Sequence, residues 1–385
     1  VKAVMLPQGS MERNVYLVGR IRPINLREQS LGPGRCITVT DTSVTLSNPE
    51  TEEKKVHDLD FCFDSSNPDS PENADNEILF QQLGTRILSD ALKGYHVCVF
   101  SHGHTQTGKT YTFIGQEKDP GLIPRLLETI IATEDNLHDA YDIFGSFYEV
   151  QNENIFDCLK RDFHTTGLKI RSNGTIEGLT KKKLENITDC EDMLSQMLRS
   201  ISYMELSSNT VFTVEFVRRG SNPKNEDLPI HKIQFVDLAS TPSGNAELRS
   251  HVSSLGIHKK SNTQEKSLLA WANVMAAIAE ADRSQKAGQK SKVYIPYRSS
   301  TLTKALEQSL CKNSRSYIIA HFSPSSFAYK QSMNTLRHIT RTREIKHVTK
   351  NDDILFRDMK DPSFVPAAGG GWRWAYCMKV NESSS

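Results

Sequence analysis

The segment that most constrains this chain is a glycine-rich loop that follows residue 102. Residues 103–110 read Gly-His-Thr-Gln-Thr-Gly-Lys-Thr and fit the pattern G-x-x-x-x-G-K-[ST]. The loop comes after an apolar run and before a segment that can begin a helix, which is the context this motif requires. Backbone N–H groups of such a loop surround phosphates, Lys109 reaches the β- and γ-phosphates, and the Thr110 hydroxyl ligates Mg²⁺. The loop predicts a P-loop nucleotide-binding fold; the alternative is a chance match in a turn rich in Gly and Thr.

A P-loop site also needs an acidic residue at the end of a hydrophobic strand. Phe235-Val236-Asp237 supplies one. Asp237 is therefore the candidate partner of Mg²⁺ through a water molecule, and a candidate catalytic residue. The alternative is an ordinary strand-end aspartate that caps the following turn.

Apolar runs alternate with helix-like segments along most of the chain. Alternation of this kind predicts an α/β domain with a central, mixed or parallel sheet and helices on both faces. Polar inserts at 67–76, 219–227 and 282–292 are interpreted as surface loops. The expected strands are 15–18, 98–100, 143–148, 233–236 and 317–320, and the expected helices include 78–92 and 267–281.

Composition narrows the possible partners and compartments. The formal net charge of the 385 residues is +1, which argues against a general nucleic-acid coat and requires that any electrostatic partner meet a local patch. Seven scattered cysteines without a CxxC pair indicate a reducing compartment. No apolar run approaches the roughly 20 residues that span a bilayer, and no signal-peptide layout is visible. The expected location is the cytoplasm or the nucleus.

Seven motifs follow one another in an order that identifies a family. In addition to the phosphate loop and Asp237, they are Arg20-Ile21-Arg22-Pro23, Gly121-Leu122-Ile123-Pro124-Arg125, Ser146 to Asp157, Ile295 to Thr303 and Asn334-Thr335-Leu336-Arg337. From about Val15 to Ile345 the chain resembles kinesin motor domains. The resemblance implies a P-loop NTPase fold with a central eight-stranded mixed sheet and three helices on each face.

The resemblance also implies a site for ATP or ADP with Mg²⁺. Arg20, Arg22, Pro23 and Tyr111 would border the adenine, since a base stacks on aromatic and arginine planes. For Tyr111 the alternative is simple helix packing. The phosphate-binding residues would be Gly103, Thr105, Gln106, Thr107, Gly108, Lys109 and Thr110, with Thr110 and Asp237 serving the metal.

In kinesins the regions after the second switch strand and around P-Y-R-x-S-x-L-T meet the microtubule. Tubulin is strongly acidic, so a basic patch would steer docking. The alternative is an ordinary solvated loop. Thr301 stands where a Lys is usual, which removes one expected contact, and Glu265 replaces an Asn. The candidate contacts are His258, Lys259, Lys260, Lys286, Lys290, Lys292 and Arg298.

Both nucleotide-sensing switches depart from the family pattern. The first should read N-x-x-S-S-R-S-H, but residues 204–212 read Met-Glu-Leu-Ser-Ser-Asn-Thr-Val-Phe, which leaves Ser207 and Ser208 as candidate positions. The second should read D-L-A-G-S-E, but Ser240 replaces its Gly and Pro242 its Glu. Gln106 stands where the phosphate loop usually has its middle Gly. The resemblance therefore implies a catalytic apparatus that has lost key parts.

The composition of the two ends and the resemblance together divide the chain into four expected segments. Residues 1–13 are interpreted as a leader or tag, 14–345 as the motor domain, 346–361 as a neck-linker-like segment and 362–385 as a flexible tail. The position of the linker and of the R-x-R-P motif favours an N-terminal, plus-end type of motor. The implied location is the microtubule cytoskeleton of the cytoplasm, without a membrane span or a nucleic-acid partner; the sequence does not specify cargo or stalk partners.

Three hypotheses remain open at this point. The first is a divergent kinesin that binds adenine nucleotide and microtubules but hydrolyses ATP weakly or not at all. The second is an active ATP-driven motor whose switches use substitute residues. The third is another P-loop NTPase that shares only the nucleotide half, against which the segment Pro296 to Thr303 argues.

Overall fold

The computed structural model describes most of the region between Asn14 and Thr342. Its described residues are 14–32, 34–67, 69–70, 73–133, 140–160, 167–203, 208–219, 230–239, 258–286, 293–310 and 314–342. The predicted leader, neck-linker-like segment and tail therefore lie outside the described residues, and so do Ser207, Ser240, Pro242, Lys290 and Lys292.

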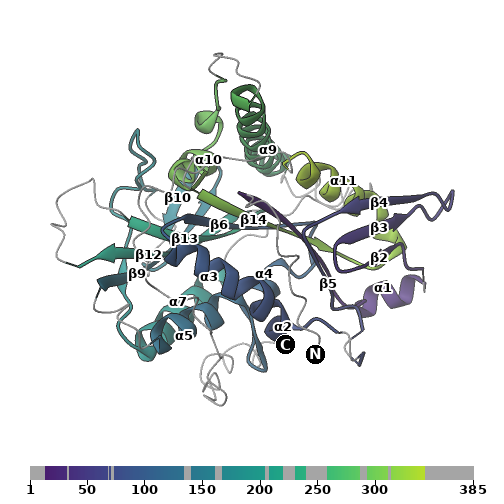
Figure 1. Cartoon of the computed structure of the whole chain (residues 1–385), viewed down its shortest axis with the longest axis horizontal. Helices are drawn as coiled ribbons and strands as arrows, with labels where there is room; N and C mark the ends of the chain where they lie inside the picture. The colour runs from purple at the N-terminus through teal and green to yellow at the C-terminus, as the bar shows by residue number, and fades with distance from the viewer. Residues whose placement is uncertain are drawn as a thin grey trace.

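A mixed sheet forms the centre of the domain (Figure 1). The middle strands are parallel and almost wholly buried, which explains why they read as continuous apolar runs. Two long antiparallel strands extend the sheet on one side, and the two-residue strand β11 (Lys182–Lys183) pairs with one of them. The strand order is β10 (Asn154–Asp157), β9 (Tyr141–Gln151), β12 (Asn209–Arg218), β13 (Ile230–Asp237), β6 (His96–His102), β14 (Ser314–Phe322), β1 (Val15–Ile21) and β5 (Phe61–Asp64).

Helices cover both faces of this sheet (Figure 1). One hydrophobic cluster joins the sheet to α2 (Asn76–Leu79), the π-helical turn η1 (Phe80–Gly84), α3 (Thr85–Leu92), α5 (Leu122–Ala132) and α7 (Ile187–Tyr203). The second cluster joins the opposite face to α9 (His258–Lys286), α10 (Thr301–Ala305) and α11 (Tyr329–Thr340). The predicted three-layer α/β architecture is confirmed.

Smaller elements surround the central sheet. The strands β2 (Ile37–Val39), β3 (Ser43–Ser47) and β4 (Lys54–Asp58) form a second sheet, and β7 (Gly115–Gln116) pairs with β8 (Asp119–Pro120). The short helices are α1 (Leu26–Leu31), α4 (Lys109–Phe113) and the 3-10 turns η2 (Tyr297–Ser299), η3 (Glu307–Leu310) and η4 (Ser326–Ala328).

All five strands expected from the apolar runs lie within observed strands. The expected helix at 267–281 lies within α9, which begins at His258 and ends at Lys286. The interpretation of 282–292 as a loop was therefore wrong for residues 282–286, where the polar sequence continues a long helix. Within the described part of the chain, no helix combines the length and the apolar character needed to cross a bilayer.

Candidate functional site

The glycine-rich loop lies between the buried strand β6 and the short helix α4. Gly103 allows a close approach, because a Cβ there would lie 2.6 Å from the backbone oxygen of His321. Gly108 has φ 92°, in the left-handed region that favours glycine. Gln106 also has a positive φ, 62°, although it carries a side chain. Residue 106 thus keeps the positive φ that favours glycine, although Gln has replaced the glycine that kinesins usually have there.

Lys109 is buried, with 8% of its surface exposed. Its Nζ donates hydrogen bonds to the backbone oxygens of Gly103 and His104, both at 3.1 Å. Burial lowers the pKa of Lys109, and the nearby Asp237 carboxylate opposes that shift. The ammonium group is thus held inside the curve of the loop, where it can exchange carbonyl partners for phosphate oxygens.

Thr110 and Asp237, the two residues predicted to serve the metal, contact each other. Thr110 Oγ1 donates to Asp237 Oδ2 at 2.9 Å. Burial raises the pKa of Asp237, while Lys109 and the Thr110 hydroxyl act in the opposite direction. Its Oδ1 is buried and has no hydrogen-bond partner in the described structure. A hydroxyl and a carboxylate with a buried, unbonded oxygen are hard donors of the kind that would suit Mg²⁺, with Thr110 as a direct ligand and Asp237 acting through water.

The tyrosine of the predicted base site is placed by a buried arginine. Arg20 is 4% exposed, and its guanidinium carbon lies 5.6 Å from the centre of the Tyr111 ring. Arg20 Nη1 donates to Asn76 Oδ1 and to Thr112 Oγ1, and burial lowers the pKa of Arg20 to about 10. Tyr111 remains 36% exposed, and its OH donates to Asp119 Oδ2 at 2.7 Å. Arg20 therefore packs against the buried side of the Tyr111 ring. Of these two residues, only Tyr111 is exposed enough to contact a base.

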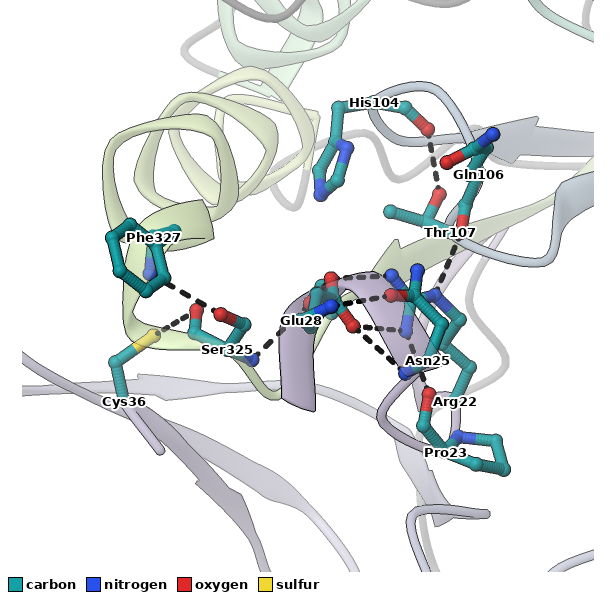
Figure 2. Close-up of polar contacts among 11 residues, drawn as sticks. Arg22, Pro23, Asn25, Glu28, Cys36, His104, Gln106, Thr107, Ser325 and Phe327 are labelled. Carbon is teal, nitrogen blue, oxygen red and sulfur yellow. Dashed lines mark hydrogen bonds and ion pairs between the residues drawn. The ribbon is translucent and has the colours of Figure 1, made fainter. Parts of the chain in front are cut away.

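Arg22 connects the first strand to the phosphate loop (Figure 2). Its guanidinium forms a two-pronged ion pair with Glu28, with contacts of 2.6 and 2.7 Å, and its Nε donates to the Gln106 backbone oxygen at 2.6 Å. Glu28 also accepts from Ser323 Oγ at 2.5 Å. Burial raises the pKa of Glu28, but hydrogen bonds from Arg22 and Ser323 outweigh it, so the pKa lies below its ordinary value.

The remaining predicted residues lie around these anchors. Pro23 is exposed and its backbone oxygen accepts from Arg22 Nη1. Thr107 is buried, and its hydroxyl donates to the His104 backbone oxygen at 2.8 Å. Thr105 is half-buried on the loop. The structure therefore gathers all the predicted phosphate-loop and base-site residues around one end of β1 and β6.

Comparison with known proteins decides the family. The kinesin motor domain profile matches residues 20–345. The chain belongs to the kinesin motor-domain family. Kinesin-like protein KIF16B of Mus musculus is 30% identical over 382 residues, covering 90% of this chain and 29% of the relative. Kinesin-like protein KIF13B of Homo sapiens is 29% identical over 382 residues, covering 91% and 20%. The chain thus spans less than a third of the length of these relatives.

Solved kinesin structures share its fold. A segment of KIF14 with ADP, in complex with a microtubule, has a TM-score of 0.71 and 27% identity, covering 87% of this chain and 96% of that one. A longer KIF14 segment, with AMP-PNP in a dimer bound by two heads to a microtubule, has a TM-score of 0.74 and 26% identity, covering 88% and 96%. The sequence-based identification of a kinesin motor domain is confirmed.

A hydrogen bond joins the described ends of the two segments that the sequence predicts to be the switches. Ser208 is half-buried and directly precedes β12, whereas Ser207 lies outside the described residues. Asn209, 4% exposed, accepts a hydrogen bond at its Oδ1 from the backbone N–H of Ala239, 2.9 Å away. Ala239 lies two residues beyond Asp237. A neutral amide therefore links the first switch to the second at the point where the kinesin pattern breaks.

The candidate microtubule contacts that the structure describes lie at the two ends of α9 and on η2. His258, Lys259 and Lys260 begin α9 and Lys286 ends it, so about 40 Å of helix separates the two groups at 1.5 Å per residue. Arg298 is exposed on η2, and the structure describes neither Lys290 nor Lys292. The middle of α9 instead exposes Lys266, Leu269, Asn273, Ala276 and Glu280, with Leu269 60% exposed.

Sequence reasoning missed the residue that joins this face together. Asn152 and Glu153 have φ of 49° and 61° and form the two-residue turn between β9 and β10. Glu153 accepts from Ser267 Oγ on α9 at 3.1 Å and from the Thr301 backbone N–H at the start of α10 at 2.5 Å. Thr301 Oγ1 also donates to the Glu153 backbone oxygen at 2.9 Å. The threonine that replaces the usual Lys thus gains an internal contact.

Proposed function

We propose that this chain is a microtubule-binding kinesin domain that binds ADP or ATP with Mg²⁺ and hydrolyses ATP weakly or not at all. The observation that carries the proposal is the Asn209–Ala239 hydrogen bond. The phosphate loop is similar to that of other kinesins, but the contact between the two predicted switches is a hydrogen bond between uncharged groups.

The binding half of the proposal rests on Lys109, Thr110 and Asp237. Lys109 Nζ has a positive charge enclosed by the loop, and Asp237 Oδ1 is a buried acceptor beside Thr110. A charge-assisted contact contributes about 1.5–3 kcal/mol, so phosphates and a divalent cation would stabilise the loop together. Bound Mg²⁺ would neutralise phosphate charge, and Lys109, Thr110 and Asp237 would hold the phosphates and the ion in position.

The catalytic half rests on what the switches have lost. In kinesins, an Arg of the first switch and a Glu of the second form a salt bridge when the switches close on ATP. Here Asn209 and Pro242 stand at or near those positions. Loss of one partner would leave an unpaired charge, costing about 3–5 kcal/mol if buried, whereas loss of both avoids that penalty. Phosphoryl transfer depends on positioning and charge stabilisation, so the fold can persist while the chemistry fails.

Steady-state ATP hydrolysis with and without microtubules tests this proposal. We expect a very low basal rate that microtubules barely raise. The alternative, an active plus-end motor, requires another basic residue such as Arg199 to act for the missing one. Microtubule-stimulated turnover of about 1–100 per second would contradict the proposal and favour that alternative.

The track half of the proposal has its own test. The α9–α10 face would bind tubulin through Arg298 and the basic ends of α9, together with the exposed stripe of α9 around Leu269. Co-pelleting with microtubules should weaken as salt rises, because exposed charge pairs are screened over about 8–10 Å at ordinary ionic strength. Lack of co-pelleting at low salt would contradict the microtubule assignment and the implied cytoskeletal location.

A further inference from the structure

The Arg22 guanidinium donates its hydrogen bonds to acceptors within the protein, which leaves few for a ligand. Four contacts hold its guanidinium: two to Glu28, one to the Pro23 backbone oxygen and one to the Gln106 backbone oxygen, all at 2.6 or 2.7 Å. A guanidinium has five N–H donors, so few remain for a ligand. Its side chain is only 14% exposed. This geometry describes a brace between β1 and the phosphate loop more than a ligand for the adenine.

Gln106, whose backbone oxygen Arg22 contacts, has an unusual backbone conformation. Gln106 has φ 62°, a left-handed conformation that is strained for a residue with a side chain. The Gln106 oxygen that Arg22 holds belongs to the peptide group that follows this residue. The Gln106 side chain is exposed, and among the described residues it forms no hydrogen bond. Arg22 therefore opposes relaxation of the loop at its strained point.

Glu28 fixes the other end of the brace. Its backbone N–H donates to Asn25 Oδ1 at 2.8 Å, while its carboxylate accepts from the Asn25 backbone N–H at 3.1 Å and from Ser323 Oγ at 2.5 Å. The carboxylate, which α1 carries, is thus held from the turn before α1 and from the turn after β14. Such anchoring limits the positions that the Arg22 guanidinium can adopt.

We propose that Glu28 is a positioning residue for nucleotide binding. It fixes Arg22, and through the Arg22–Gln106 hydrogen bond it keeps the phosphate loop in the conformation that receives phosphates. This inference rests on the proposed binding of ADP or ATP. It predicts that Glu28 matters only because residue 106 is not glycine.

The test is a double-mutant cycle of Glu28→Gln and Gln106→Gly on the whole chain. Glu28→Gln preserves size and some hydrogen bonding but removes the charge that holds Arg22. We expect it to weaken MgADP binding about tenfold, mainly through faster dissociation. In the Gln106→Gly background the same change should weaken binding less than about threefold, because glycine adopts positive φ without strain. The exposed residue Glu50 supplies the charge control, since Glu50→Gln should leave MgADP affinity unchanged.

Thermal unfolding without nucleotide provides a second readout of the same cycle. Glu28→Gln should lower the unfolding midpoint less in the Gln106→Gly background than in the wild type. Equal effects in both backgrounds, for both affinity and midpoint, would overturn the inference. If the wild type binds no MgADP, the proposed function fails, but the unfolding cycle still decides whether Glu28 and Gln106 are coupled.

Discussion

Replacement of His102 by phenylalanine should flatten the acid-side dependence of folding stability. His102 ends β6 and is 2% exposed, with its ring centroid 5.9 Å from that of Trp271 on α9 and 5.6 Å from that of His338 on α11. In the described structure, neither of its ring nitrogens has a hydrogen-bond partner. Burial first, and then the charges of His338 and Lys109, lower the pKa of His102 to about 3.

The sign of the effect follows from proton uptake. The unfolded chain protonates a histidine near pH 6.5 and the folded chain only near pH 3, so unfolding takes up a proton between these values and stability falls as the pH drops through that window. At about pH 5.5 this single group makes the free energy of unfolding about 1.3 kcal/mol smaller than it is at neutral pH. The His102→Phe variant lacks this contribution at every pH.

Urea unfolding measured from about pH 7.5 to about pH 5 compares the two slopes. His96, His104 and His321 also have lowered pKa values, so the wild-type slope contains several histidines, and the difference between the proteins isolates one. A phenylalanine that fits poorly would shift the whole curve but would not change its slope. Parallel curves for the two proteins would refute the conclusion that His102 is buried and neutral.

Three further predictions concern the site. Lys109→Ala should weaken MgADP binding by about 1.5–3 kcal/mol in calorimetry, and unchanged affinity would exclude its phosphate contact. Asn209→Ala should lower the free energy of unfolding by about 1–3 kcal/mol in urea titration, because the buried Ala239 N–H loses its acceptor; Asn209→Asp, which keeps an acceptor oxygen, should be milder. Glu153→Ala should raise hydrogen exchange at the start of α10 more than Glu177→Ala, a change in an exposed surface ion pair.

Most of the fold could be predicted because its central strands are buried on both faces. Such strands read as apolar runs, and Cys98–Phe100 and Ile233–Val236 needed no further information. The length of α9 could not be predicted, because its ends are polar and its helical periodicity is confined to the residues that contact the sheet. Residues 282–286 continue the helix without a hydrophobic signal.

The site was predictable where chemistry lies in a contiguous motif. The sequence points to Lys109, Thr110 and Asp237 because the first two lie in the loop motif after β6 and the third ends β13, and parallel strands end at the same edge of the sheet. Partners that are distant in the sequence were not identified. Nothing near Glu28 indicates that it holds Arg22 against Gln106, and nothing near Glu153 indicates that it bonds both α9 and α10. Those contacts exist only once the sheet order is known.

Arg20 illustrates the same limit. A motif implies that the side chain lies near the adenine, but it does not specify the direction of the guanidinium. In the fold Arg20 is buried beneath Tyr111 and bonds Thr112, whose hydroxyl donates to the Gly108 backbone oxygen at 3.0 Å. Burial of that kind depends on Asn76, which comes from a helix 56 residues away in sequence.

A single-turnover experiment tests the central claim most directly. The chain, in excess over radiolabelled ATP and saturated with microtubules, would be quenched in acid at successive times, and the ratio of ADP to ATP would be measured. This ratio reports the chemical step alone, without product release. The account predicts that bound nucleotide remains ATP for many turnovers of an ordinary motor. Conversion to ADP at about 1–100 per second would contradict it, because the linked, uncharged switches would then still position the attacking water.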